Sequence, residues 1–266
     1  MAAGEDEGEG EQGRFRASAS DIYERVKREA GEELDRPVAA LAFSGLFAGS
    51  TVGFGPVAAA GAAAALRGHA DAQLIAALFF PIGFIVVIVG RAQLFTENTL
   101  YPVTLVLDER RHVLATLRLW VVVLTANLIG VVLFVLIVTK TGALAPDVVA
   151  KVAEEGRHAT HGTWAAFFWS AVLGGWAIAL VAWLIQSSGM VIGQVVLIWT
   201  LAFVVGLVRL DHSVSTSMEV LCAALKNEVH LGHALVWLTA VVIGNIAGGV
   251  LITALLNYGQ VRAGED

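Results

Sequence analysis

Cysteine and charged residues are scarce in this 266-residue chain. The single cysteine, Cys222, excludes a disulfide within the chain and says nothing about the redox compartment. Only 15% of the residues are charged, against roughly a quarter in soluble proteins. Since 57% are hydrophobic and the mean hydropathy is +0.73, the composition excludes an ordinary soluble domain and predicts a protein surrounded by membrane lipid.

The sequence also lacks the residue arrangements on which most enzymes depend. It contains no paired nucleophile and base, no glycine-rich phosphate loop and no cluster with metal-ligand spacing. No basic patch is interleaved with aromatic residues, so nucleic acid is not an expected partner. We therefore expect no enzymatic activity, no cofactor and no metal site.

Long apolar runs are what the sequence does contain. A bilayer core of about 30 Å needs about 20 apolar residues in a helix. Six segments meet this requirement: 38–66, 73–107, 113–139, 163–186, 190–226 and 233–258. An even number of spans places both ends of the chain on one side. Ten Lys and Arg residues fall on that side and five on the other, which predicts cytoplasmic termini and a multi-pass protein of the cell membrane.

A short polar region precedes the first span. The chain opens on an acidic, glycine-rich stretch, and then apolar residues recur four apart with charges between them, at Ile22, Val26, Ala30 and Leu34. This pattern predicts an amphipathic helix at the membrane surface, with Ser20 as its N-cap. The expected organisation is a disordered tail, a surface helix, a transmembrane channel domain and a cytoplasmic tail, over residues 1–19, 20–36, 37–258 and 259–266.

Polar residues break two of the six segments. The second contains GRAQLFTENTLYPV (90–103) and the fifth contains RLDHSVSTS (209–217). These are the middle members of two triplets, and in transporters built from inverted repeats such discontinuous helices mark the permeation site. Backbone unwinds there only where protein or a water-filled cavity satisfies it. We therefore predict an all-α integral membrane protein with six transmembrane segments, two interrupted helices and a pore between them. The alternative is two ordinary helices, each followed by a polar surface loop.

Glycines form two ridges of small residues at four-residue spacing. They are Gly45, Gly49 and Gly53 in the first segment and Gly244 and Gly248 in the last. Such ridges let helix backbones approach one another closely. We expect them to mediate packing within one protomer.

Four stretches, in order along the chain, resemble the formate/nitrite transporters. They are LFTENT (94–99), ANLIG (126–130), LDHSVS (210–215) and IGNIAGG (243–249). The resemblance covers residues 36–258 and is closest to a formate-transporter-like branch that carries LFTEN. It implies an aquaporin-like inverted repeat with one pore per protomer, assembled into a homopentamer. The implied substrates are small monovalent anions of weak acids, such as formate, nitrite or hydrosulfide.

The same resemblance implies which residues line the pore. His212 takes the place of the central pore histidine, Thr96 lies opposite it, and Asn245 is a lining candidate. Apolar constrictions resist hydrated ions, and the matching positions are Phe80, Phe84, Leu94 and Phe95.

His212 also suits this role by its chemistry. A buried imidazole is normally neutral, yet it donates one hydrogen bond and takes up a proton at modest cost, so it can protonate or hydrogen-bond a passing anion. The alternative is a structural histidine whose hydrogen bonds are satisfied by the protein. Asn245 has the same alternative, and each apolar candidate is equally compatible with a place in the core.

Several residues depart from the pattern of formate channels. Gly174 or Gly175 replaces an amide in the fourth segment, and the position of an outer lysine falls near Ala159. We consider Arg157, His158 and His161 as substitutes for that cation.

The charges of the two interruptions, Arg91, Glu97, Arg209 and Asp211, are a further departure. An unpaired charge at the bilayer centre costs roughly 2.5 to 3.5 kcal/mol on insertion scales. We therefore predict a charge network in which Arg91 pairs with Glu97 and Arg209 with Asp211, or in which the pairs form across the two interruptions. The alternative is that each side chain extends separately to water.

Two further functions remain open from the sequence. A pore for small neutral solutes would fit the apolar constrictions and a neutral His212. A membrane protein with a regulatory role would need no conducting path.

Overall fold

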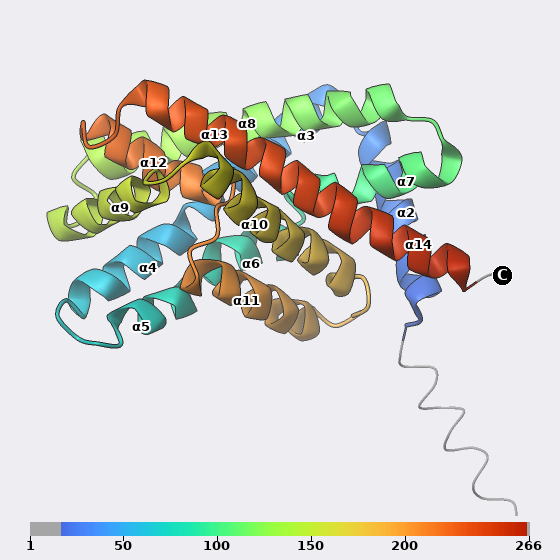
Figure 1. Ribbon diagram of the computed structural model, residues 1–266, viewed down its shortest axis with the longest axis horizontal. Coiled ribbons are helices and arrows are strands. Elements are labelled where there is room, and N and C mark those ends of the chain that lie inside the picture. The colour runs from blue at the N-terminus through green and yellow to red at the C-terminus, as the bar shows by residue number, and fades with distance from the viewer. Residues whose placement is uncertain (1–16, 265–266) are drawn as a thin grey trace, which may run out of the picture.

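The structure, a computed structural model, describes residues 17–264, and its regular elements are helices (Figure 1). The first half contains α2 (Ala19–Asp35), α3 (Val38–Val52), α4 (Phe54–Ala65), α5 (Ala72–Phe79), α6 (Pro81–Val89), the 3-10 turn η1 (Glu97–Thr99), α7 (Tyr101–Glu109) and α8 (Val113–Lys140). The second half contains α9 (Pro146–Ala159), α10 (Trp164–Ile185), α11 (Val191–Leu207), α12 (Ser215–Leu225), α13 (Leu231–Ala247), the π-helical turn η2 (Gly248–Ala254) and α14 (Leu255–Ala263). Most of the predicted tail lies outside the described residues.

Five helical runs are long and apolar enough to cross a membrane within the described chain. They are Val38–Ala65, Ala72–Val89, Val113–Lys140, Trp164–Ile185 and Leu231–Ala263. The predicted fifth segment, 190–226, is divided between α11, of 17 residues, and α12, of 11 residues. The second is divided as well, because the chain leaves α-helix between α6 and α7.

Helix α2 begins earlier than predicted and is capped by a different serine. The Ser18 hydroxyl accepts a hydrogen bond from the Asp21 backbone N–H at 3.1 Å, and the Asp21 carboxylate accepts one from the Ser18 N–H at 2.8 Å. This reciprocal capping needs an acceptor three residues after the cap, which Asp21 supplies for Ser18. The prediction of Ser20 as the N-cap is therefore wrong. The apolar face of α2 is buried against protein, notably α7 and α14, and the place of this helix at the membrane surface stays a prediction.

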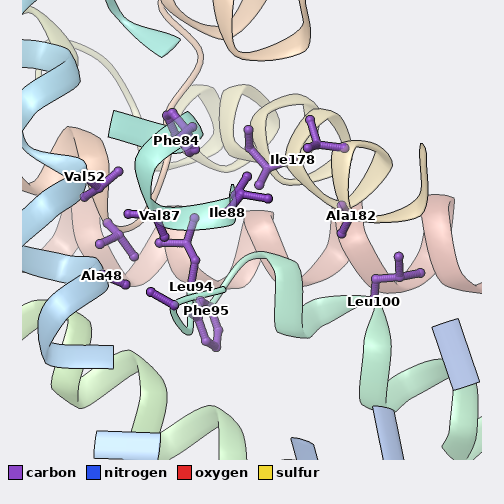
Figure 2. Close-up of a cluster of buried hydrophobic side chains, with 14 of the residues drawn as sticks. Ala48, Val52, Phe84, Val87, Ile88, Leu94, Phe95, Leu100, Ile178 and Ala182 are labelled. Carbon is purple, nitrogen blue, oxygen red and sulfur yellow. The ribbon is translucent and has the colours of Figure 1, made fainter. Parts of the chain in front are cut away.

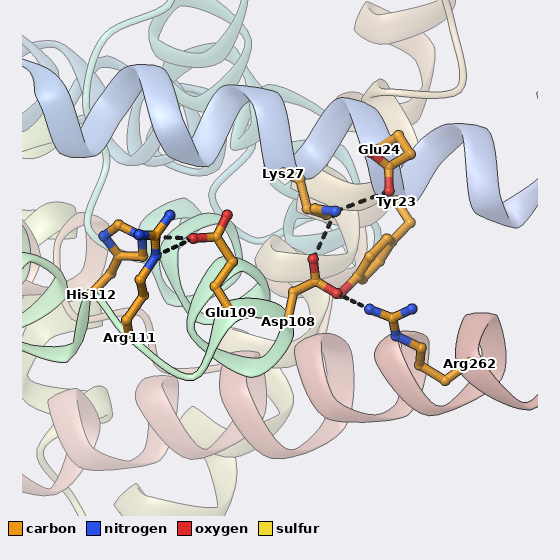
Figure 3. A network of polar contacts seen from close by, with 8 residues as sticks. All are labelled: Tyr23, Glu24, Lys27, Asp108, Glu109, Arg111, His112 and Arg262. Atoms are coloured by element: carbon orange, nitrogen blue, oxygen red, sulfur yellow. Dashed lines mark hydrogen bonds and ion pairs between the residues drawn. The ribbon is translucent and has the colours of Figure 1, made fainter.

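A polar network joins α2, α7 and α14 at one end of the molecule (Figure 3). The Asp108 carboxylate binds Lys27 at 2.7 Å and also binds Arg262, while the Tyr23 hydroxyl donates to it at 3.4 Å. The hydrogen bond to Asp108 raises the pKa of Lys27 above its usual value. Both ends of the described chain lie at this end of the molecule, and α4, α5 and α9 lie at the other (Figure 1).

Candidate functional site

Helices α6 and α11 end in the same way, each two residues before an arginine. Arg91 and Arg209 both adopt a left-handed backbone with φ of 54°. In each case the following N–H bonds the carbonyl five residues back, from Ala92 to Val87 at 3.0 Å and from Leu210 to Val205 at 2.9 Å. This is the Schellman ending of a helix, and it turns the chain out of α-helix at two related places.

The predicted charge pairs do not form. Arg91 binds Glu29 of α2 through two hydrogen bonds of 2.5 and 2.7 Å, and Arg209 binds Glu155 of α9 at 3.1 Å. The left-handed turn directs each arginine toward the helix that begins its half of the chain. The side chain of Arg91 is 70% exposed there and that of Arg209 is 45% exposed.

The two acids of the predicted network stay apart from the arginines. Glu97 is 7% exposed and Asp211 is 6% exposed. The Asp211 carboxylate accepts a hydrogen bond from the Trp237 indole N–H at 3.0 Å. Neither acid forms an ion pair within residues 17–264.

Two asparagines hold the interrupted stretches in place by matching bonds. The Asn127 amide oxygen accepts from the Phe95 N–H at 2.9 Å, and its NH₂ group donates to the carbonyls of Gly45 and Gln93 at 2.8 and 2.9 Å. Asn127 comes from α8 and is fully buried.

Asn245 of α13 does the same for the second stretch. Its amide oxygen accepts from the Ser213 N–H at 2.8 Å, and its NH₂ group donates to the carbonyls of Ala171 and Asp211 at 2.8 and 3.1 Å. Both N–H groups are used within the protein, which gives Asn245 a positioning role, and its place in the lining of the pore stays a prediction.

Sequence reasoning missed the role of Asn127, although a signal for it exists. Asn127 lies 36 positions after Arg91, and Asn245 lies 36 positions after Arg209, so the same spacing occurs in both halves of the chain. Two serines repeat the correspondence: Ser44 accepts from the Gln93 N–H and Ser170 from the Asp211 N–H, both at 3.0 Å.

Glycines allow the asparagine helices to approach. A Cβ atom on Gly49 would lie 2.0 Å from the Asn127 carbonyl oxygen, and one on Gly175 would lie 2.4 Å from the Asn245 Cα. A Cβ atom on Gly174 would lie 2.4 Å from the Asp211 carbonyl oxygen, so close backbone contact requires glycine at both positions considered for the departure in the fourth segment. Close packing is confirmed for both glycine ridges, since a Cβ on each member would meet neighbouring atoms at 2.9 Å or less: Gly45, Gly49, Gly53, Gly244 and Gly248.

We expect Gly49→Ala to destabilise the protein by at least about 1–3 kcal/mol, because the added methyl group would separate α3 from α8. The midpoint of thermal unfolding in detergent measures this. Gly61→Ala in α4 is the matched control, since a Cβ there meets nothing within 4 Å and alanine favours helix by up to about 1 kcal/mol. An unchanged midpoint for Gly49→Ala would contradict the close-contact role.

Thr96 and His212 meet where the two interrupted stretches come together. The Thr96 hydroxyl lies 2.8 Å from His212 Nε2, and both residues are fully buried. His212 Nδ1 accepts from the N–H groups of Val214 and Ser215 at 3.2 and 3.1 Å, so in the neutral imidazole the proton is on Nε2. Nε2–H therefore donates to the Thr96 oxygen. The Thr96 hydroxyl proton is left available to another acceptor.

Apolar side chains surround this pair. The Phe84 ring contacts the His212 ring edge to face at 5.0 Å, and Phe80 lies 5.7 Å from Phe84 between ring centroids. Leu94 and Phe95 lie in the turn between α6 and η1, beside Ala48 (Figure 2). Phe95 also packs against Trp120 at 6.1 Å.

A cavity of about 810 Å³ lies on the α9 side of the molecule, with Phe80 and Asp211 in its wall. Its lining includes His158 and His161 but not Arg157, which binds Glu228 at 3.3 Å. Sequence reasoning did not single out a half-buried cation of its wall, Lys151. Burial opposes the Lys151 charge, but hydrogen bonds to Glu154 at 2.9 Å and Glu155 at 3.0 Å outweigh burial and raise the pKa of Lys151.

Comparisons with known proteins agree with the resemblance. The family model for formate/nitrite transporters matches residues 20–259. Inner membrane protein YfdC of Escherichia coli (strain K12) is 30% identical over 261 residues, 94% of this chain and 81% of that protein. A probable formate transporter of Methanothermobacter thermautotrophicus is 30% identical over 235 residues, 82% of this chain and 83% of that protein.

Two solved structures share the fold. An FNT family ion channel has a TM-score of 0.76 at 22% identity and covers 92% of this chain and 99% of its own. A pentameric formate channel with formate bound has a TM-score of 0.70 at 18% identity and covers 89% and 99%. From its matched length and its relatives, the chain is a multi-pass membrane protein that belongs to the formate/nitrite transporter family.

Proposed function

We propose that the protein is a membrane channel or transporter for small monovalent anions of weak acids, such as formate or nitrite. The observation that carries this is the buried Thr96–His212 pair, which offers one free hydroxyl proton where two non-helical stretches meet. Family membership and a structural neighbour that has formate bound support the choice of substrate.

In this proposal the chain crosses the membrane six times, with interrupted second and fifth segments and an aquaporin-like inverted relation between its halves. The matching arginine, serine and asparagine contacts support that relation. Five such protomers form a homopentamer, by analogy with the pentameric neighbour. Both termini face the cytoplasm, as the distribution of basic residues indicates.

The proposed path runs from the α9-side cavity past Phe80 and Phe84 to the central pair. The aromatic rings exclude water, and the hydroxyl of Thr96 donates a hydrogen bond to the anion. The sequence leaves open whether His212 protonates or hydrogen-bonds the anion, and the geometry favours hydrogen bonding. A proton on Nδ1 would break the two backbone hydrogen bonds that this nitrogen accepts.

Flux into liposomes tests this function. We expect purified protein to raise the uptake of formate and nitrite above that of empty liposomes, and to leave the uptake of uncharged glycerol unchanged. Uptake of glycerol alone would instead favour a pore for neutral solutes. No uptake of any solute would favour a non-conducting regulatory protein.

A further inference from the structure

Glu97 is a buried carboxyl group that the proposed path does not use. It begins η1, directly after Thr96, and is 7% exposed. Its carboxyl group has no hydrogen bond or ion pair to any residue between 17 and 264. An ionised group buried in this way is costly unless something else compensates it.

The charged groups around Glu97 do not compensate it. They are Glu29 and Glu33 of α2 and Arg91 of the preceding turn, and the Tyr101 phenol of α7 faces the same group. Arg91 is the one cation among them, and Glu29 already holds it by two hydrogen bonds. With every acid ionised, this group of residues would carry a net negative charge.

The remaining contacts around Glu97 leave the net charge of this group of residues negative. Glu33 is bound by Arg36 at 3.0 Å, and the Tyr101 hydroxyl donates to the Ala182 carbonyl at 3.3 Å. The elements α8, α10 and η2, which pack against η1, add no further charged group that acts on Glu97 among the residues described.

We propose that Glu97 binds a proton and controls anion passage by its protonation. As a neutral carboxyl group it leaves the neighbouring Thr96 accessible to an anion. As a carboxylate it adds a negative charge beside that position and opposes the anion. The corresponding residue of the other stretch, Ser215, has a buried hydroxyl without a hydrogen-bond partner among residues 17–264 and no carboxyl group, so the control acts on the η1 side alone.

This inference rests on the proposed function, and one comparison separates the two. Full-length wild type and Glu97→Gln are placed in liposomes, and formate exchange is measured at equal inside and outside pH, from acidic to alkaline. Formate titrates identically for both proteins, so its own protonation cancels in the ratio of rates. We expect Glu97→Gln and wild type to be equal at the lowest pH, and Glu97→Gln to be at least about tenfold faster at the highest.

Different results would overturn the role of Glu97 and the proposed transport function. A ratio that stays constant with pH would overturn the role of Glu97, whereas absent exchange in wild type would overturn the proposed function. Glu109→Gln, which removes an exposed carboxylate of the same half, is the matched control and is expected to follow wild type at every pH.

If Glu97→Gln fails to fold, a second measurement tests whether Glu97 binds a proton and loses it as pH rises. The infrared carbonyl band of a protonated carboxyl group can be followed in wild type and assigned by its shift in Glu97→Asp. Loss of that band as pH rises supports the proposal. A band that is absent, or that persists unchanged, at every pH overturns it.

Discussion

Leucine in place of Asn245 is expected to prevent the protein from reaching a stable fold. The substitution removes three buried hydrogen bonds and leaves the Ser213 N–H and the Asp211 carbonyl without these partners, whereas the Ala171 carbonyl keeps its place in the hydrogen bonding of helix α10. Each of these two groups costs about 1–3 kcal/mol, so the total of about 2–6 kcal/mol reaches the whole stability of a marginally stable domain. We expect a severe loss of folded protein in detergent, measured by size-exclusion chromatography.

Asn127→Leu should have the same effect, because Asn127 makes the corresponding bonds on the other side. Asn257→Leu is the control, since Asn257 donates a single bond to the Thr253 carbonyl on a half-buried face. Its cost should stay near 1 kcal/mol, roughly the net value of one hydrogen bond. If Asn245→Leu behaved like Asn257→Leu, the positioning role of the two asparagines would be wrong.

Thr96→Val is expected to reduce formate flux about 10- to 100-fold while the protein remains folded. Valine keeps the shape of threonine but removes the hydroxyl that receives His212 Nε2–H and offers its own proton. A hydrogen bond to a charged group contributes about 1.5–3 kcal/mol, and 1.4 kcal/mol corresponds to tenfold. The measurement is initial uptake into liposomes at fixed pH.

Thr104→Val provides the matched comparison for this loss. Thr104 is also buried, but its hydroxyl donates to the carbonyl of Leu100, the N-cap of its own helix, α7. Flux should therefore stay within about threefold of wild type, since one such bond affects stability more than passage. Equal flux for Thr96→Val and wild type would remove the central pair from the path.

Much of the architecture follows from local properties of the sequence. The apolar runs predict the helices, and polar residues in runs too long for one span predict where helix α6 and helix α11 end. The meeting of Thr96 and His212 was expected from the resemblance, and the structure brings them to 2.8 Å. Whether the flanking aromatic residues line a path remains a prediction.

The charges show where sequence reasoning fails. Proximity in sequence favours pairing Arg91 with Glu97, yet a left-handed residue redirects the arginine to a helix 62 positions earlier. Backbone handedness at a non-glycine residue is set by tertiary contacts and is not visible in residue type. The role of Asn127 was likewise hidden, because its bonds join three separate parts of the chain.

The most direct test of the anion path is chemical modification at Thr96. Thr96→Cys is prepared in a Cys222→Ala background, which removes the native thiol, and mercuric ion is applied to liposomes containing the protein. We predict that mercury modifies the new thiol and stops the remaining formate flux, that excess formate slows the modification, and that Cys222→Ala alone is unaffected. Modification of the thiol that leaves formate flux unchanged would contradict the claim that anions pass between the two interrupted stretches.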